Sequence, residues 1–417
     1  MLIKTILNQV AKYQGFVYES VKMIPNGEQK ELRVSIRARR NSPPLCSRCG
    51  RPGPGYDTLG VRRFEFIPFW GFLVYFVYVM RRVDCPRCGV TVEQVPWAQG
   101  KSPITREYGW FLARWARRMS WSEVAAAFRT SWHTVFRAVE MAVTWGRNHM
   151  DRDGITAIGI DEMQWGRGHR YITVVYQINQ GAKRLLWVGE KRTAKTLLRF
   201  FRWLGKDRTQ GLEFICSDMW KAYLKVIAKK AAQAIHVLDR FHIMMHMNQA
   251  IDEVRAGESK ELVRQGYEPV LKKSRWLLLK RPENLKESQQ ASLAELLQYN
   301  LKSVKSYLLK EQFQCFWEYI SPHWAGLFLD TWCTKVLRSG IEPMKKVARM
   351  LRAHRELILN WFRAQKEFSS GIVEGLNAKA KLTTRKAYGF REFKTLEIAL
   401  YHNLAKLPEP KCTHEFF

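Results

Sequence analysis

The sequence predicts a mixed α/β core that is interrupted by an all-helical insertion and preceded by two small N-terminal domains. Three observations support this prediction. Strand and helix patterns alternate over residues 151–247, helical patterns alone fill residues 248–368, and two CxxC motifs occur before residue 100. At 417 residues, with 46 % hydrophobic side chains, the chain is long enough for several domains with buried cores.

The chain carries a large positive charge. It contains 69 lysines and arginines against 38 aspartates and glutamates, a formal net charge of +31. Such a charge indicates a polyanionic partner, with nucleic acid as the first candidate and an anionic membrane surface as the second. No secretory signal pattern opens the sequence, so we expect a cytoplasmic protein.

Residues 1–100 are expected to form a zinc-ribbon domain. Two CxxC motifs, each followed by glycine, supply four candidate ligands: Cys46, Cys49, Cys85 and Cys88. Two thiolates on one tight turn can face the same tetrahedral Zn²⁺, and the glycine lets the backbone fold around the sulfur atoms. The pattern therefore predicts one structural zinc ion. Free thiols or a redox pair are the alternative.

An uncharged aromatic stretch, residues 66–80, separates the two motifs. It is shorter than the roughly 20 residues that a membrane-spanning helix requires. Pro68, Gly71 and the many aromatic and β-branched side chains favour two strands joined by a turn. We therefore expect no association with a membrane.

Residues 101–150 are expected to form a helix-turn-helix domain that binds DNA. The pattern shows a capped helix over 120–128, a turn over 129–131 and a second helix over 132–142. The candidate DNA contacts are Ser131, His133, Thr134 and Arg137. An ordinary helical hairpin is the alternative, because the turn contains no glycine.

Residues 151–247 are expected to form the first part of the α/β core. Strands are predicted over 155–160, 171–178, 184–188, 212–216 and 235–238, with helices over 193–204 and 219–232. This order is that of the ribonuclease-H-like fold. The first and fourth strands are neighbours in that fold, so we expect Asp161 and Asp218, which follow them, to lie side by side.

The helical insertion is expected over residues 248–368, and residues 369–417 are expected to return to the core as C-terminal helices. Ser370 can cap a helix on which Glu374, Asn377 and Lys381 share one face by their spacing. A solvated helix with charges on one side is the alternative. A carboxylate beside an amide and a row of cations also suits a phosphodiester site.

Asp161, Asp218 and Glu374 are the candidate catalytic carboxylates. Two divalent ions about 4 Å apart, held by these groups, would supply what phosphoryl transfer on DNA requires. Oxygen ligands favour Mg²⁺ or Mn²⁺ over Zn²⁺. Glu162 has no assigned role. The candidate phosphate contacts are Lys379, Lys381, Arg385 and Lys386.

Several motifs resemble the ISL-three (ISL3) family of bacterial insertion-sequence transposases. They are IDE at 160–162, SDMWKAY at 217–223, HVLDRFH at 236–242, NQAIDEVR at 248–255, KSRWLLLKRPENL at 273–285, and EGLNAKAK with RKAYGF from 374 onwards. The resemblance covers nearly the whole chain. It implies a DDE transposase that nicks element ends and joins the freed 3′-hydroxyl to target DNA, with Asp161, Asp218 and Glu374 as the catalytic triad.

The resemblance also implies that the ribbon and the helix-turn-helix bind the terminal inverted repeats, in an assembly of at least two protomers, expected to be a dimer on DNA. We expect the protein at the bacterial nucleoid. One departure is visible, since Ser369 and Ser370 precede Gly371 where the family is expected to have asparagine. Two other functions stay open: a transposase-derived DNA-binding regulator without catalysis, and a ribonuclease-H-like nuclease without strand transfer.

Asp239 competes with Asp218 as the second catalytic carboxylate. Asp218 is preferred because it directly follows the fourth predicted strand. Asp239, His242 and Asn377 are therefore expected to support the site rather than to perform the chemistry.

Overall fold

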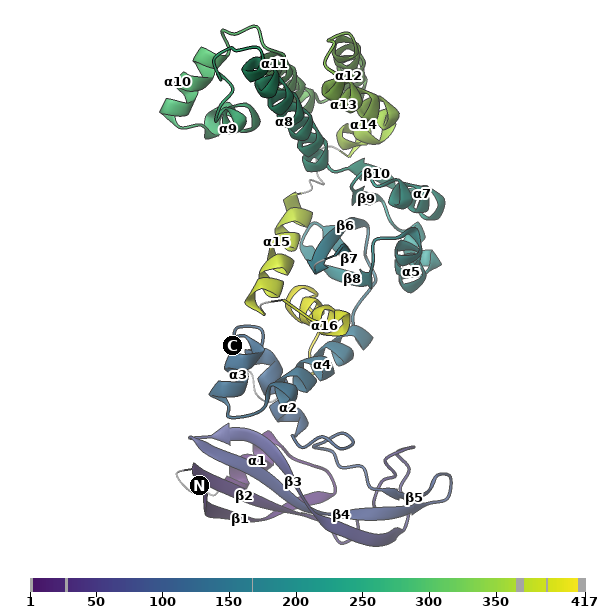
Figure 1. Ribbon diagram of the computed structural model, residues 1–417. Helices are drawn as coiled ribbons and strands as arrows, with labels where there is room; N and C mark the ends of the chain where they lie inside the picture. Colours follow the sequence, from purple (N-terminus) through teal and green to yellow (C-terminus); the bar gives the residue numbers. More distant parts are fainter. Residues whose placement is uncertain (1–2, 27–28, 167, 365–370, 388, 412–417) are drawn as a thin grey trace. The chain divides into compact units, whose positions relative to one another are not determined.

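The structure is a computed structural model that describes residues 3–26, 29–166, 168–364, 371–387 and 389–411 (Figure 1). It divides into two compact units. One consists of Met1–Asp151 with Arg385–Phe417, and the other of Arg152–Thr384. Among the described residues, no helix combines the length and the hydrophobicity that a membrane crossing requires.

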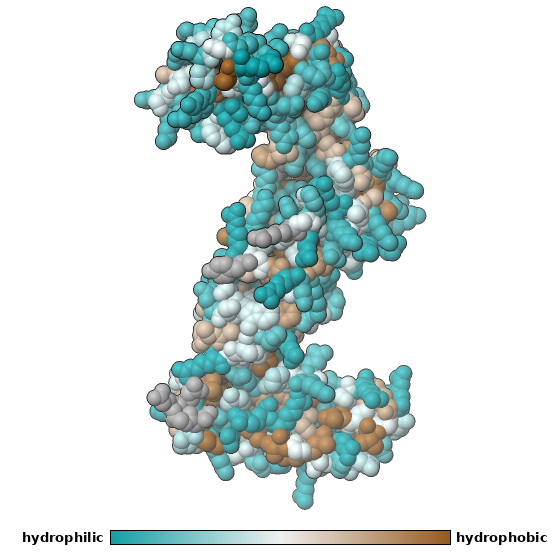
Figure 2. Space-filling view, viewed as in Figure 1, coloured by the Kyte–Doolittle hydropathy of each residue, from teal (hydrophilic) through white to brown (hydrophobic). Residues whose placement is uncertain are grey.

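The first unit contains the short helix α1 (Ile3–Val10) and a five-stranded sheet. Its strands are β1 (Phe16–Asn26), β2 (Gln29–Ala38), β3 (Gly55–Phe69), β4 (Phe72–Cys85) and β5 (Gly89–Val92). The order is β1-β2-β4-β3, and β5 pairs with β4. Hydrophobic side chains also reach the surface of this sheet (Figure 2), among them Val61 and Val79, which pair across β3 and β4.

The aromatic stretch at 66–80 forms two strands joined by a turn, as predicted. Strands β3 and β4 are antiparallel, and Trp70 and Gly71 between them both have positive φ, which closes the hairpin. Phe64, Phe76 and Trp97 are fully buried against this hairpin. The stretch is hydrophobic because one face of it forms the core of the sheet.

Three helices follow the sheet: α2 (Arg106–Trp115), α3 (Trp121–Ala127) and α4 (Trp132–Asn148). Ser120 and Glu123 form a capping box at the start of α3. Ser131 caps α4 by accepting a hydrogen bond from the Thr134 backbone N–H over 3.0 Å. Between them Arg129 adopts φ of 53°, so the turn reaches the left-handed region without a glycine.

Helix α16 (Phe393–Leu404) belongs to this first unit. Glu397 pairs with Arg147 of α4 over 3.0 Å, and Glu409 pairs with two arginines of the α2 region over 2.8 Å. These ion pairs and the buried face of α16 hold residues from Arg385 onwards against α2 and α4. From the sequence, by contrast, all of residues 369–417 are predicted to belong to the α/β core.

The second unit is built on a five-stranded sheet of order β10-β9-β6-β7-β8. Its strands are β6 (Ala157–Gly166), β7 (Arg170–Asn179), β8 (Ala182–Glu190), β9 (Phe214–Ser217) and β10 (Ile235–Leu238), with helices α5 (Ala194–Leu204), α6 (Lys206–Gln210) and α7 (Lys221–Lys230). Strands β6, β9 and β10 are parallel, and β7 is antiparallel to both β6 and β8. The first and fourth strands of the unit are neighbours, as predicted.

Strand β6 is longer than predicted. It continues to Gly166 because it stays paired with β7, where Asp161 faces Val174 and Glu162 faces Thr173. Its parallel pairing with β9 stops earlier, at Ile160. The two acids therefore lie within β6, at the point where its pairing with β9 ends.

The helical insertion of the second unit contains helical elements only, among its described residues. They are α8 (Arg240–Arg264), α9 (Arg275–Leu279), η1 (Pro282–Asn284), α10 (Glu287–Leu296), α11 (Lys302–Gln314), η2 (Cys315–Glu318), α12 (Pro322–Leu337), α13 (Glu342–Ala353) and α14 (Arg355–Arg363). It begins earlier than predicted, directly after Asp239.

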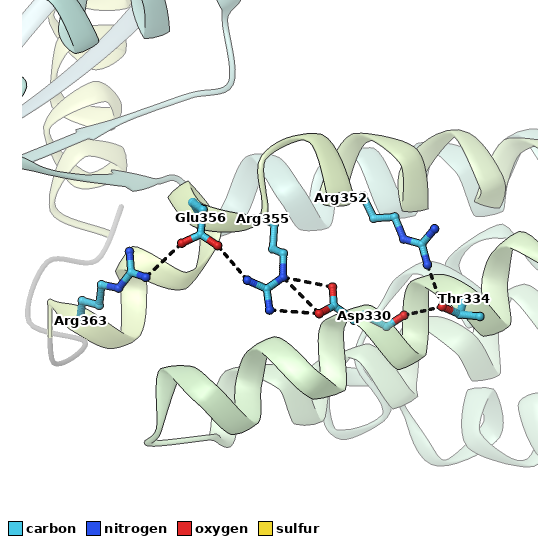
Figure 3. Close-up of polar contacts among 6 residues, drawn as sticks. All are labelled: Asp330, Thr334, Arg352, Arg355, Glu356 and Arg363. Carbon is cyan, nitrogen blue, oxygen red and sulfur yellow. Dashed lines mark hydrogen bonds and ion pairs between the residues drawn. The ribbon is translucent and has the colours of Figure 1, made fainter.

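A polar network joins the last three of these helices (Figure 3). The Arg355 guanidinium binds the Asp330 carboxylate over 3.0 to 3.2 Å, and it also contacts Glu356 over 2.8 Å. Gly326 makes room for this arginine, because a Cβ atom there would lie 2.6 Å from its Nη2. The network fixes α14 against α12.

Most of helix α15 (Gly371–Lys386) belongs to the second unit, which ends at Thr384, two residues before the end of the helix. It lies beside β6 (Figure 1). The predicted cap at Ser370, like the departure at Ser369, lies outside the described residues.

Candidate active site and metal centre

Asp161 and Asp218 come from neighbouring parallel strands. Ile160 of β6 is paired with Ser217 of β9, so each aspartate is the next residue along its chain. Burial raises the pKa of both carboxyl groups. The nearby Asp239 carboxylate raises both further. Acidic groups therefore gather at one edge of the sheet, as the sequence predicts.

Asn377 links α15 to this edge. Its Nδ2 donates a hydrogen bond to Asp161 Oδ2 over 2.5 Å, and its Oδ1 accepts one from the Tyr176 hydroxyl over 2.8 Å. The other Asp161 oxygen accepts a hydrogen bond from the Glu162 backbone N–H over 2.7 Å. The Tyr176 contact sets which end of the amide faces Asp161.

Gly159 lets α15 approach β6 closely. A Cβ atom at this position would lie 2.4 Å from Val373 Cγ2, so no larger residue fits without moving the helix. Glu374 follows Val373 and precedes Asn377 by three positions, which places it on the Asn377 side of α15. Its side chain is exposed.

The structure does not bring the three candidate carboxylates into contact distance of one metal ion. Within the described part of the chain, the only group of three or more candidate ligand atoms that all lie within 4.8 Å of one another is a cysteine cluster. Asp161 and Asp218 share the sheet edge, and Glu374 lies on the helix that Asn377 attaches to this edge.

Asp239 and His242 form a pair at the start of α8. Asp239 is buried, and its two oxygens accept hydrogen bonds from the Phe241 backbone N–H and from His242 Nδ1, each over 2.7 Å. The bond to Asp239 raises the pKa of His242 to about 9, and Asp161 and Asp218 add to the rise. His242 is thus a cation at neutral pH, which partly balances the acidic cluster.

Glu162 and Arg192 add an ion pair to the same edge. The guanidinium of Arg192 contacts Glu162 Oε1 and lies over the rings of Tyr171 and Trp220, at 4.4 and 4.8 Å from their centroids. Burial and then Asp218 raise the pKa of Glu162, whose Oε2 is buried without a hydrogen-bond partner in the described structure.

Arg192 is not among the site residues that were predicted from the sequence. It follows β8, which runs in the same direction as β6 because β7 is antiparallel to both. The position of Arg192 just after β8 could have indicated its place in the site, because residues that follow strands of the same direction lie at one edge of the sheet.

The four motif cysteines form one cluster. Their sulfur atoms all lie within 4.8 Å of one another, and Cys49 Sγ lies 3.5 Å from Cys85 Sγ. A tetrahedral zinc ion with bonds of about 2.3 Å requires sulfur atoms roughly 3.8 Å apart. Gly50 and Gly89 adopt φ of 71° and 72°, as expected for the glycines after each motif. The cluster therefore fits one tetrahedral metal ion.

The cysteines of this cluster differ in how readily their thiols ionise. Thr91 Oγ1 donates a hydrogen bond to Cys46 Sγ over 3.2 Å, and this bond and backbone N–H groups lower the pKa of Cys46 to about 6. Burial and then the neighbouring cysteines raise the pKa of Cys88 to about 12. A bound cation would favour the thiolate form of all four.

The four DNA contacts predicted for residues 101–150 line one cavity of about 750 Å³. Ser131, His133, Thr134 and Arg137 line it together with residues 99–106. Arg62 fixes the loop at 100–102, because its guanidinium donates to the carbonyls of Gly100 and Ser102 over 3.0 and 2.9 Å. The cavity thus contains the capped N-terminus of α4 and several cationic side chains.

The candidate phosphate contacts on α15 are all exposed. They are Lys379, Lys381, Arg385 and Lys386. The division between the two units falls between Thr384 and Arg385, so the last two belong to the first unit.

Known proteins match this chain over almost its full length. Residues 158–400 match the family model for DDE transposases of the ISL3 type, described as transposase. The sequence is 28 % identical over 395 residues to the transposase for insertion sequence element IS1001 of Bordetella parapertussis, covering 94 % of this chain and 96 % of that protein. It is 29 % identical over 402 residues to the transposase for element IS1557 of Mycobacterium tuberculosis, covering 90 % and 89 %.

Proposed function

This chain belongs to the ISL3 family of DDE transposases, and we propose that it binds the terminal inverted repeats of an insertion sequence, cleaves DNA at their ends and joins the freed ends to target DNA. The observation that carries the proposal is the hydrogen bond from Asn377 to Asp161. It attaches the helix that bears Glu374 to the edge that bears Asp161 and Asp218. The strand order of the sheet supports a ribonuclease-H-like core.

In this proposal Asp161, Asp218 and Glu374 hold two Mg²⁺ or Mn²⁺ ions. Their oxygen-only donors suit these cations, and the like charges gathered at the sheet edge favour a cationic ligand there. Bound divalent ions would activate the attacking oxygen and stabilise the leaving oxygen.

The surrounding residues prepare the carboxylates for that task. Asn377 fixes the direction of Asp161 Oδ2, and the His242 cation keeps the cluster compatible with several ionised acids. Asp239 is buried, and its pairing with His242 supports its assignment as a positioning group rather than as the second ligand. Lys379 and Lys381 are exposed on α15, where they would contact DNA phosphates.

The first unit supplies DNA recognition in this proposal. One Zn²⁺ held by the cysteine cluster stabilises the ribbon. The helix-turn-helix presents the N-terminus of α4, where Ser131 and Thr134 suit a phosphate and His133 and Arg137 suit base edges or phosphates. The protein would act as a homo-oligomer, at least a dimer, that holds two element ends.

The test compares the wild type with Glu374→Gln and with the matched control Glu392→Gln, whose glutamate is exposed and precedes α16. The substrate is a duplex that carries an element end with its flanking DNA, in Mg²⁺ or Mn²⁺. We expect cleavage and joining by the wild type and the control. Glu374→Gln should bind the duplex equally well without cleaving it.

Two outcomes would replace the proposal. Cleavage by the wild type without any joined product would identify a nuclease. Binding by the wild type without cleavage in either metal would identify a DNA-binding regulator.

A further inference from the structure

A pocket of about 320 Å³ lies in the helical insertion, against the first turns of α8. Arg240, Met244 and Asn248 line it, spaced by four residues along one face of that helix. Asp239, the N-cap of the same helix, and His242 in its first turn belong to the acidic cluster. The pocket and the acidic cluster therefore share the start of α8.

The pocket carries more positive charge than its surroundings balance. Within the described residues, no carboxylate pairs with Arg240, whose guanidinium lies over the Trp317 ring at 4.9 Å. Burial and the nearby Arg281 both lower the pKa of Arg240. Among the described residues, the carboxylate that pairs with Arg281 is that of the exposed Glu283, over 3.7 Å. Two arginines that repel each other in a partly buried site favour an anion between them.

Lys310 contributes to the floor of the pocket but is already engaged. It is 1 % exposed, and its Nζ donates to the Leu278 carbonyl over 2.9 Å and pairs with Glu311 over 3.0 Å. The arginines, rather than this lysine, are thus the cations that a ligand can reach.

Two side chains of the pocket wall each hold a buried polar atom that lacks a partner among the described residues. Trp361 is 7 % exposed, and its Nε1–H has no acceptor among the described residues. The buried Oδ1 of Asn248 likewise has no donor there. An unmatched donor and acceptor destabilise a buried site until a ligand satisfies them. The edge of a nucleobase offers both an acceptor and a donor, and its flat face suits the aromatic Phe241, which also lines the pocket.

We propose that this pocket binds one unpaired nucleotide of the DNA strand that passes the carboxylate site. The base contacts Trp361 and Asn248, and its phosphate lies between Arg240 and Arg281. Cations beside aromatic side chains are the usual means of holding single-stranded DNA. The inference rests on the proposed function, which supplies a strand with a freed end.

The test uses the full-length protein and two labelled probes, a blunt duplex and the same duplex with a single-stranded extension. The variants are Trp361→Phe, which retains the ring and removes the N–H, and Arg281→Gln, at a side chain that is 55 % exposed. Arg264→Gln is the control, because it removes one charge from the end of α8, where Arg264 is 76 % exposed.

We expect the wild type to bind the extended probe more tightly than the blunt one. Trp361→Phe and Arg281→Gln should each weaken binding of the extended probe by about tenfold, the effect of one hydrogen bond or ionic contact. Both should bind the blunt duplex like the wild type, and Arg264→Gln should change neither. Fluorescence of 2-aminopurine in the extension should change on binding, and this change should shrink in Trp361→Phe.

Variants that bind the extended probe as tightly as the wild type would overturn the pocket assignment, even if element ends are cleaved. A selective loss of extended-probe binding, in a protein that cleaves no element end, would support the pocket and refute the proposed transposition chemistry. Arg281→Gln changes an exposed side chain, so it gives a result even if Trp361→Phe fails to fold.

Discussion

Asn377 donates a hydrogen bond to Asp161 although 216 positions separate them in the sequence. The contact depends on two further features: Tyr176 holds the far side of the Asn377 amide, and Gly159 lets the helix come close. Each of these features predicts the effect of a substitution.

Asn377→Ala should lower the rate of strand cleavage by about 10- to 100-fold, as is typical when a group that orients a metal ligand is removed. DNA binding should be unchanged. In the wild type, burial raises the pKa of Asp161 and the hydrogen bond from Asn377 partly offsets this rise. Without that bond the pKa of Asp161 should be higher, so the variant should need a higher pH for activity. Cleavage rates measured against pH check both effects. Asn403→Ala on α16 is the matched control, and equal loss in both variants would contradict the assigned role.

Gly159→Ala should destabilise the second unit by about 1–3 kcal/mol, because the new methyl group would overlap Val373. Cleavage should fall as well, since α15 must move away from β6. Thermal unfolding and cleavage assays measure the two effects. The double variant with Val373→Ala should recover part of both losses.

Gly375→Ala provides the control for the same helix. Nothing lies within 4 Å of a Cβ atom at Gly375, so the substitution should be tolerated and should stabilise the helix slightly. If Gly375→Ala proved as harmful as Gly159→Ala, the close approach at Gly159 would not be the cause.

Cys46→Ser should reduce the zinc content from about one ion per chain and should lower the melting temperature of the first unit, since structural zinc contributes directly to folding. A chelator should produce the same change in the wild type. Metal analysis and thermal unfolding provide the measurements. Cys315→Ser, at an exposed cysteine outside the cluster, should leave both unchanged.

His236 should make stability depend on pH. Burial, with a contribution from His354, lowers the pKa of His236 from 6.5 to about 4. As pH falls below 6.5, the unfolded chain binds a proton there while the folded protein does not, so the free energy of unfolding decreases until about pH 4. The full effect is on the order of 3 kcal/mol.

His236→Gln should remove this part of the pH dependence while retaining a donor for Ser217 Oγ, which lies 2.7 Å from His236 Nε2. Denaturant unfolding at several pH values between 6.5 and 4 measures it. His323→Gln, at an exposed position, should leave the slope unchanged. An unaltered slope in His236→Gln would refute the assignment.

Much of the fold follows from local sequence patterns. The aromatic and β-branched side chains of 66–80, with Pro68 and Gly71, predict the β3–β4 hairpin, and the glycines after each CxxC motif predict backbone turns that the structure contains. The neighbouring positions of the first and fourth core strands also follow from the order of the elements.

Features set by distant contacts could not be predicted in this way. Strand β6 extends past Asp161 because β7 continues to pair with it, and no local pattern marks that extension. Residues after Arg385 join the first unit through ion pairs such as Arg147 with Glu397, whose partners lie 250 positions apart. Arg192 was missed because its role depends on strand directions rather than on a motif.

Under the proposed function, the contact between Asn377 and Asp161 also determines when the protein becomes able to act. Ribosomes add roughly 5–20 residues per second, so about 10–40 s separate the synthesis of Asp161 from that of its partner. The segment Arg385–Phe417, which completes the first unit, follows later still. In the proposed mechanism, a nascent chain, or one that terminates early, therefore carries the cysteines and both sheet aspartates but lacks Glu374 and cannot yet cleave DNA. Translation itself would then delay activity until helix α15 has been made.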